Sequence, residues 1–433
     1  MPHIRQLLAT ATVAHRSSRL PAIGNDGRMD TPLEGLLVAD FTRVLSGPHC
    51  TRMLSDLGAT VIKIEPPAGD VTRFAAPRRH SMPSYYAQQN TGKRSISIDL
   101  SRTKGTALAL QLCQRADIVV ENFRPGVMEK FGLGYDTVAD HNPGVVYASI
   151  TGYGATGPWR DRRAYAPVVQ AETGLTKSQG DHGRGGVYRT DRHSHADVYT
   201  SLDAAAGILA ALYQRERTGR GQWIDIAMAQ VMLYVNEHVH DELWDDDVDP
   251  DWVRSFGNAD QPVVTVANGD AVAVAGHPAA RGNFESYLAV IGRPELADDP
   301  RFDTVASRQE HIDDLQGYIA AYAATLPDAE TLERECARYK LAVGAVRSVA
   351  DVCDSDWARE RDVIATVDDR GGGTIRIPNA PWKFSDAPGV GVHGTPRYRG
   401  EDNAEVLREV LDLSDETIAE LAATGVLSSH LPR

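Results

Sequence analysis

The stretch LLVADFTRVLSGPHCTRMLSDLGATVIKIE, residues 36–65, decides the fold class. It begins with an apolar run, LLVADFT, that is typical of a buried strand. The segment SGPHCTRMLSDLG then predicts a helix that ends at Gly58, and TVIKIE predicts the next strand. A strand, a helix and a second strand in this order predict a parallel pair of strands, because the helix crosses over between them.

The alternation of strands and helices continues to about residue 150. The segments SISIDL, DIVVENF and VVYASIT each predict a strand, and RTKGTALALQLCQRA predicts a helix between the first two. We therefore expect a mostly parallel sheet covered by helices, with ligand-binding loops at the carboxyl ends of its strands. The polar residues 158–196 are expected to form a long loop. The clearest helix follows, ADVYTSLDAAAGILAALYQRERTGRG, with Gly219 at its end.

Changes in composition along the chain predict its domains. We expect a disordered N-terminal extension over residues 1–31 and the first part of a large domain over 32–228. An acidic and aromatic stretch, DELWDDDVDPDW, predicts a linker over 229–249. Residues 250–360, largely helical in pattern, are expected to form a small domain. Residues 361–433 are expected to return to the large domain.

Charge and composition limit the partners of the protein. The chain has 45 basic and 59 acidic residues, a net charge of −14, which argues against nucleic acid or an anionic membrane as a partner. None of its apolar runs approaches the roughly 18 residues that a membrane-spanning helix needs. The four cysteines form no C-x-x-C pair and predict reduced thiols in a cytoplasmic protein. They are Cys50, Cys113, Cys336 and Cys353.

The segment VVYASITGYGATGPW, residues 145–159, contains the spacing G-x-G-x-x-G at Gly152, Gly154 and Gly157. This spacing marks a dinucleotide-binding turn only where it follows the first strand and opens a helix. Here it follows about the fifth strand, and Pro158 leads into a polar segment. We therefore expect a turn that lets the backbone approach a ligand closely, and no nicotinamide or flavin site.

Two histidine-rich patches are candidate metal sites by residue type. His193, His195 and Asp197 occupy alternate positions, and so do His238 and His240. Metal sites need three or four converging ligands, and no distant partner group is evident in the sequence for either patch. We therefore expect hydrogen-bonded or solvated histidines and no metal site. Asp197 precedes the clearest helix by about a residue, as an aspartate at a helix N-cap does.

Five ordered motifs identify a family. They resemble the family III CoA-transferases, which include formyl-CoA and carnitine-CoA transferases and the α-methylacyl-CoA racemases. This resemblance implies an α/β fold with a large Rossmann-like domain formed by both chain ends and a smaller α+β domain. It also implies that two open-ring subunits interlock into a homodimer. The motifs are LLVADFTRVLSGPHCTRMLSDLGATVIKIEPPAGDVTR, NTGKRSISIDL, ADIVVENFRPGVMEKFGLGYD, VVYASITGYGATGPW and RERTGRGQWIDIAM.

The resemblance further implies an acyl-CoA:carboxylate CoA-transferase in which Asp197 is the nucleophile. Its partners would be an acyl-CoA and a small carboxylic acid, with no cofactor beyond coenzyme A itself. The implied CoA-binding residues are Asn90, Lys93, Asn122, Phe123, Arg124, Lys130, Arg163, Ala164 and Tyr165.

Two alternatives stay open at this point. One is a 2-methylacyl-CoA racemase-like enzyme, although the racemases carry a histidine where this chain has Tyr165, so one of two bases for proton exchange is missing. The other is a non-catalytic protein that binds CoA thioesters. The chain also departs from formyl-CoA transferases at Leu45, where they carry glutamine, which argues against formate or oxalate as substrate. The sequence does not name the donor or acceptor acid.

Overall fold

The computed structural model describes residues 30–79, 82–243 and 261–431. The chain divides into two compact units. One comprises the residues up to Thr176, Thr190–Val235 and the segment from Arg359 onward, and the other comprises Lys177–Arg189 and Asn236–Ala358. The expected N-terminal extension lies almost entirely outside the described residues, as do the end of the expected linker and the start of the expected small domain.

The first unit is built on a six-stranded sheet with the order β5-β2-β1-β6-β7-β8, in which every neighbouring pair is parallel. This is the strand order of the Rossmann fold, and the predicted parallel sheet is confirmed. Because β1 and β6 lie side by side and the chain leaves them in opposite directions, the sheet has its switch point between them. The strands are β1 (Leu37–Asp40), β2 (Thr60–Glu65), β5 (Arg94–Ser97), β6 (Ile118–Glu121), β7 (Val146–Thr151) and β8 (Gln222–Ala227).

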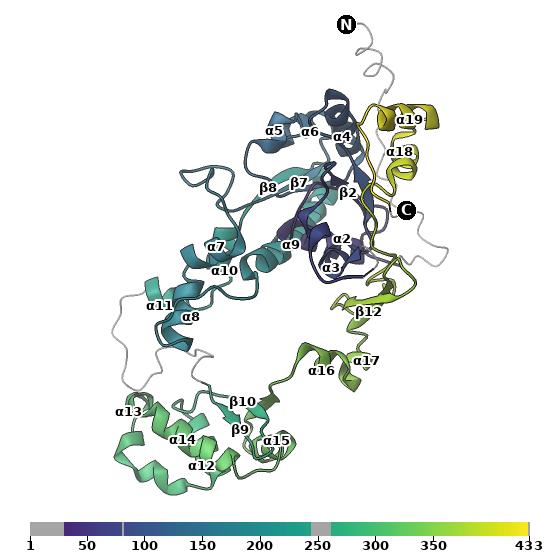
Figure 1. Cartoon of the computed structure of the whole chain (residues 1–433). Helices are drawn as coiled ribbons and strands as arrows, with labels where there is room; N and C mark the ends of the chain where they lie inside the picture. Colours follow the sequence, from purple (N-terminus) through teal and green to yellow (C-terminus); the bar gives the residue numbers. More distant parts are fainter. Residues whose placement is uncertain (1–29, 80–81, 244–260, 432–433) are drawn as a thin grey trace. The chain divides into compact units, whose positions relative to one another are not determined.

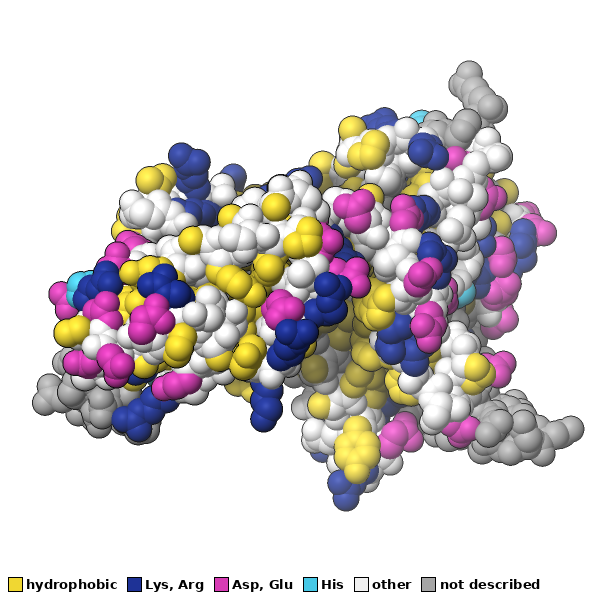
Figure 2. Space-filling view, turned by 90° about the horizontal axis from the view of Figure 1, so that it is seen from below, with side chains coloured by type: hydrophobic (Ala, Val, Ile, Leu, Met, Phe, Trp, Pro, Cys, Tyr) yellow, Lys and Arg dark blue, Asp and Glu magenta, His cyan; other side chains and the backbone are white. Residues whose placement is uncertain are grey.

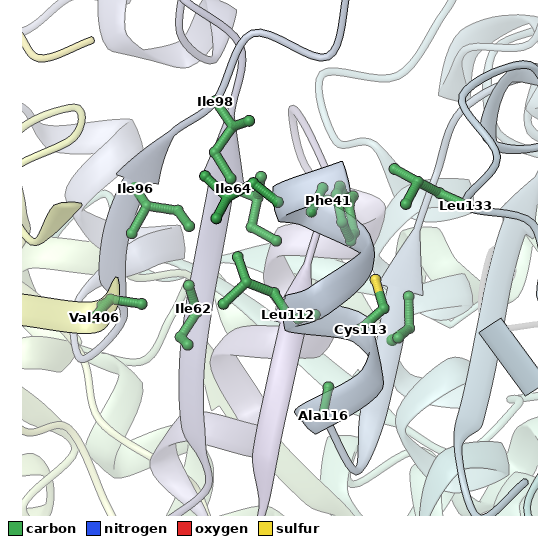
Figure 3. Close-up of a cluster of buried hydrophobic side chains, with 14 of the residues drawn as sticks. Phe41, Ile62, Ile64, Ile96, Ile98, Leu112, Cys113, Ala116, Leu133 and Val406 are labelled. Carbon is green, nitrogen blue, oxygen red and sulfur yellow. The ribbon is translucent and has the colours of Figure 1, made fainter. Parts of the chain in front are cut away.

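Helices cover both faces of this sheet (Figure 1). On one face, α2 (Ser46–Asp56) and α9 (His195–Thr218) bury apolar side chains against alternate strand residues. On the other face, the core includes Leu112 from one helix and Ile62 and Ile64 from β2 (Figure 3). The helices of that face are α4 (Thr103–Arg115), α6 (Tyr135–His141), α18 (Asn403–Leu411) and α19 (Asp415–Ala423).

The C-terminal segment protects the edge of the sheet at β5. The backbone N–H of Ser95 donates to Asp402 Oδ2 at 2.8 Å, and the N–H of Ser97 donates to Asn403 Oδ1 at 2.9 Å. Ile98 also forms an antiparallel bridge with Leu427. These bonds satisfy N–H groups that an open edge would leave exposed to other chains, so residues from both ends of the chain complete one unit.

The expected long loop over residues 158–196 contains two short helices instead: α7 (Ala166–Glu172), in the first unit, and α8 (Leu175–Gly183), most of which belongs to the second unit. The remaining elements of the first unit are η1 (Val71–Phe74), β3 (Arg78–Arg79), β4 (Met82–Pro83), α3 (Ser84–Asn90), α5 (Val127–Lys130), α10 (Met228–Tyr234), β12 (Ile364–Asp368) and β13 (Thr374–Pro378).

The second unit packs helices against an antiparallel sheet of order β11-β10-β9. Its elements are α11 (Val239–Leu243), β9 (Val263–Thr265), β10 (Ala271–Ala275), α12 (Asn283–Ile291), η3 (Pro294–Asp298), η4 (Pro300–Phe302), α13 (Val305–Glu310), α14 (Ile312–Ala323), α15 (Ala329–Ala337), β11 (Ala342–Ala345) and α16 (Val349–Cys353). Helix α17 (Asp356–Glu360) spans the boundary between the two units.

The described helices include none that is both long and apolar enough to cross a membrane. Basic and acidic side chains are interspersed on the face drawn in Figure 2, with hydrophobic side chains among them.

Candidate active site

Asp197 lies in the first turn of α9, on the face of the sheet that α2 also covers. The helix begins at His195, so Asp197 is its third residue and Ser194 occupies the N-cap. The expectation that Asp197 caps the helix is therefore wrong. As a residue of the first turn, its carboxylate is still favourably placed near the positive end of the helix dipole.

Ser46, the first residue of α2, binds the Asp197 carboxylate with both its hydroxyl and its backbone N–H. Burial raises the pKa of Asp197 to about 6, and these two hydrogen bonds oppose that rise. The hydroxyl of Ser201 lies 2.7 Å from the carbonyl oxygens of both Ser46 and Asp197. The N-terminal ends of α2 and α9 are thus joined around one carboxylate.

The loop between β1 and α2 holds Ser46 in place through unusual backbone geometry. Val44 has a φ of +69°, a left-handed conformation that is strained for a β-branched residue. Its backbone N–H donates to Asp70 Oδ2 at 3.2 Å. At Gly47, the second residue of α2, an added Cβ would lie 2.2 Å from the Cβ of Thr42, so this position allows only glycine. The strained Val44, its hydrogen bond to Asp70 and the steric limit at Gly47 together fix the conformation of this loop.

Asn122, which directly follows β6, binds the same loop across the switch point of the sheet. Its Nδ2 donates to the carbonyl oxygen of Arg43 at 2.8 Å and to Ser46 Oγ at 3.3 Å, and its Oδ1 accepts from the Arg43 N–H at 2.8 Å. The resemblance implies that Asn122 contacts CoA. In this structure its amide holds the residues that present Ser46 to Asp197.

Asn90 and Lys93 lie in the interior, with only 1% and 2% of their surfaces exposed. Lys93 Nζ contacts Asp40 Oδ2 at 3.1 Å, Thr51 Oγ1 at 2.7 Å, Asn90 Oδ1 at 2.9 Å and the carbonyl oxygen of Pro48 at 2.9 Å. Burial lowers the pKa of Lys93 to about 8, against the pull of the Asp40 carboxylate. The two side chains therefore support β1 and α2 from beneath and do not line an open surface.

Of the next three implied CoA-binding residues, one is half-buried and two are exposed to solvent. Phe123 packs partly against the core, and its backbone N–H donates to Glu121 Oε2 at 2.8 Å. Arg124, in the loop after β6, and Lys130, at the end of α5, are both exposed. They supply cationic groups near the carboxyl edge of the sheet.

Glu121 is a buried carboxyl at the carboxyl end of β6. Burial raises its pKa to about 7, although the Ser149 hydroxyl and the Phe123 N–H both donate to it. Trp223 Nε1 donates in turn to Ser149 Oγ at 3.0 Å. The sequence motifs do not single out this acid, because a lone carboxyl at the end of an apolar strand is only a weak signal of a buried charge.

The glycine-rich turn after β7 leads to the remaining implied residues, Arg163, Ala164 and Tyr165. An added Cβ at Gly152 would lie 2.2 Å from the Cβ of Ala164, so this glycine allows the two loop segments to meet. No helix follows Gly157 in residues 158–165, all of which are described. Arg163 is exposed, and Tyr165 is 68% exposed at the N-cap of α7.

An aromatic and charged cluster stabilises the turn. Arg162 lies over the rings of Tyr153 and Trp159, with its guanidinium carbon 5.1 and 4.7 Å from their centroids. Glu172, at the end of α7, binds both Arg162 and the Tyr153 hydroxyl. Glu172 therefore has two structural partners within this cluster.

The described residues also bring one set of possible metal ligands together, namely Asp191, His193 and His195. Their ligand atoms lie within 4.8 Å of one another. The set expected from alternate positions in the sequence was His193, His195 and Asp197. Because α9 begins at His195, the alternation ends there, and Asp191 takes the third place.

Comparison with known proteins agrees with this architecture. The family model for CoA-transferase family III matches residues 33–403. Formyl-CoA:oxalate CoA-transferase of Streptomyces avermitilis is 36% identical, over 92% of this chain and 100% of the relative. Succinyl-CoA:mesaconate CoA-transferase of Haloarcula hispanica is 33% identical, over 87% and 96%. A solved CAIB/BAIF family protein from Brucella suis is 30% identical, with a TM-score of 0.74 over 88% of this chain and 100% of that one. The resemblance inferred from the sequence is confirmed, and the chain belongs to the family III CoA-transferases, enzymes that transfer CoA between carboxylic acids.

Proposed function

We propose that the protein is an acyl-CoA:carboxylate CoA-transferase that works through covalent intermediates on Asp197. The observation that carries the proposal is the pairing of this carboxylate with two donors of Ser46 at the N-terminus of α2. A desolvated carboxylate held by few, directed donors is a better nucleophile than one surrounded by water. The same donors can stabilise the negative charge that develops on an oxygen during acyl transfer.

In the first half-reaction, an Asp197 oxygen attacks the thioester carbonyl carbon of the donor acyl-CoA. The carbon–sulfur bond breaks, and CoA leaves as a thiolate beside a mixed anhydride. The thiolate then attacks the Asp197 carbonyl carbon, and the donor acid leaves as a carboxylate. The product of these two steps is an aspartyl-CoA thioester.

The second half-reaction reverses this order with another acid. The acceptor carboxylate attacks the aspartyl thioester and releases the thiolate, and a second anhydride forms. The thiolate attacks the acceptor's carbonyl carbon, so a new acyl-CoA leaves and the Asp197 carboxylate is restored. No net proton transfer is needed, which fits a site whose central group is an ionised acid.

We infer that the exposed cations Arg124, Lys130 and Arg163 contact the phosphates of CoA, since guanidinium and ammonium groups are the usual hydrogen-bond donors to phosphate. Phe123, Ala164 and Tyr165 would then contact the less polar parts of the ligand. Asn122 combines any ligand contact with its support of the loop at Ser46. Asn90 and Lys93 act from beneath the site.

We also infer that the protein forms a homodimer. Over residues 202–213 the exposed face of α9 opposite the sheet is apolar, an arrangement that usually marks an interface. The exposed residues of this face are Leu202, Ala206, Leu209, Ala210 and Tyr213.

The direct test is the intact mass of the protein after incubation with formyl-, oxalyl- and succinyl-CoA, each without an acceptor acid. The proposal expects a covalent CoA adduct with at least one donor, its absence in Asp197→Ala, and its retention in Asp203→Ala on the same helix. Adducts that persist in Asp197→Ala would place the nucleophile elsewhere. Tight CoA binding with no adduct from any donor would favour the non-catalytic alternative, and exchange of an α-proton in a 2-methylacyl-CoA would favour the racemase-like one.

A further inference from the structure

Three side chains that can coordinate a metal ion lie close together in the turn that leads into α9. Asp191, His193 and His195 present one carboxylate and two imidazoles, and their ligand atoms lie within 4.8 Å of one another. They stand outside the CoA-transfer chemistry proposed above. Two imidazoles and one carboxylate form a mixed nitrogen and oxygen donor set that suits borderline transition-metal ions.

The carboxylate of Asp191 already lies between the two rings. Its Oδ1 is 3.2 Å from His193 Nδ1, and its Oδ2 is 3.6 Å from His195 Nε2. Ligands on a tetrahedral zinc ion with bonds of about 2.0–2.2 Å stand about 3.3–3.6 Å apart, so the 3.6 Å separation matches such a site and the 3.2 Å separation is slightly shorter. The ligand atoms of the two imidazoles lie within 4.8 Å of each other, so they need approach by no more than about 1.5 Å to reach the same spacing.

The surroundings limit how these groups move. The backbone N–H of His193 donates to Asp191 Oδ1 at 2.8 Å, which orients the carboxylate toward the rings. The His195 ring lies 5.6 Å from the ring of Tyr199, one helical turn further along α9. The His193 side chain is 75% exposed, so its ring can rotate to close the site and an ion can reach it from solvent.

We propose that Asp191, His193 and His195 bind one divalent ion of the Zn²⁺, Co²⁺ or Ni²⁺ class, with water completing the coordination. Magnesium and calcium are poor candidates, because they prefer oxygen donors and this set has two nitrogens. The bound ion would tie residues 191–195 to the first turn of α9. Its function would be to restrain the start of the helix that carries Asp197, without taking part in the transfer of CoA.

The test is a titration of Co²⁺ into the full-length, chelator-treated protein, followed by visible absorption and by calorimetry with Zn²⁺. We expect one equivalent to bind with the absorption bands of a low-coordinate Co²⁺ site. Affinity should fall by about tenfold or more in both Asp191→Asn and His193→Asn, because each loses one of three ligands. The matched control is His240→Asn, which removes a histidine from the other histidine-rich patch and should leave the binding unchanged.

Absence of stoichiometric Co²⁺ binding by the wild-type protein would overturn the proposal, and so would equal binding by all three variants. The His193 side chain is mostly exposed, so its replacement should leave the thermal unfolding midpoint of the metal-free protein unchanged. Zn²⁺ should raise that midpoint in the wild-type protein and in His240→Asn, and should raise it less in Asp191→Asn and His193→Asn, as ligand linkage requires. Metal-free enzyme should retain its CoA-transfer rate, so this test and that of the Asp197 intermediate fail independently.

Discussion

Ser46 is the residue through which the site acts most directly on Asp197, because its hydroxyl and N–H both donate to that carboxylate. Hydrogen bonds to charged groups contribute about 1.5–3 kcal/mol. We expect Ser46→Ala to lower kcat by about 10- to 100-fold while the unfolding midpoint changes little. Steady-state kinetics and chemical denaturation of the same preparation would measure both effects.

Asn122 should act on the reaction through Ser46. We expect Asn122→Ala to lower kcat by about tenfold, and the double variant with Ser46→Ala to lose little beyond Ser46→Ala alone. Arg124→Ala is the matched control, since it changes an exposed cation of the same loop and should mainly raise KM for the acyl-CoA. Strictly additive losses in the double variant would show that Asn122 acts by another route.

Glu121 predicts how stability depends on pH. Its pKa is about 7 in the folded protein, against an ordinary value of 4.5, so the folded state binds the proton more tightly than the unfolded state. Protonation of Glu121 therefore favours the folded state. The resulting stabilisation is fully present below pH 4.5 and is lost as the pH rises through 7. We expect Glu121→Gln to gain up to about 3 kcal/mol relative to wild type between pH 5 and 8. Urea unfolding of both proteins at several pH values would measure this difference, and a difference that does not change with pH would contradict it.

At the scale of the elements, the turn after β7 depends on the fit of Gly152 against Ala164. A side chain at residue 152 must displace the loop that carries Arg163 and Tyr165. We expect Gly152→Ala to raise KM for the acyl-CoA several-fold and the added change Ala164→Gly to restore most of the loss. Gly207→Ala, where the added Cβ would make an ordinary 3.6 Å contact with Ile224, should leave KM unchanged. A failure of Ala164→Gly to rescue would refute this account of the glycine.

Much of the element order follows from the sequence, because the apolar periods of the strands and long helices are strong. The first strand, helix and strand lie where residues 36–65 predict them. Helix α8 escaped prediction because its segment, LTKSQGDHG, holds two glycines and little apolar periodicity. The sequence pattern predicts a start of α9 that is too late, since the polar first residues of this helix hide its apolar period. In both cases the local sequence pattern is too weak to predict the helix, and packing against other parts of the chain determines where it forms.

The site was only partly predictable for a related reason. A sequence identifies residue types, so Lys93 resembles any cation that could bind a phosphate. Its enclosure by Asp40, Thr51 and Asn90 arises from segments far apart in the chain. The same holds for Ser46, whose meeting with Asp197 depends on how α2 and α9 pack. Long-range proximity is the information that the motifs lack.

At the scale of the whole molecule, the exposed apolar face of α9 predicts self-association. Leu202 and Leu209 extend the apolar pattern of the helix, yet they lie exposed while Ile208 and Leu212 are buried. We expect Leu209→Glu to convert a dimer into monomers, because a charge at the centre of an apolar interface remains unpaired. Sedimentation velocity would measure this. Val349→Glu, at another exposed apolar residue, should leave the association state unchanged, and a wild-type monomer would contradict the dimer itself.

The joining of both chain ends in one unit has a consequence for biosynthesis. Ser95 and its partner Asp402 are 307 residues apart, and at about 5–20 residues per second a ribosome needs about 15–60 s to make that interval. Throughout this time the nascent β5 edge has no partner from its own chain and is open to strands of neighbouring polypeptides. A premature stop codon before Asp402 would therefore yield a product that contains Asp197 and Ser46 yet aggregates, and its synthesis would call on chaperones.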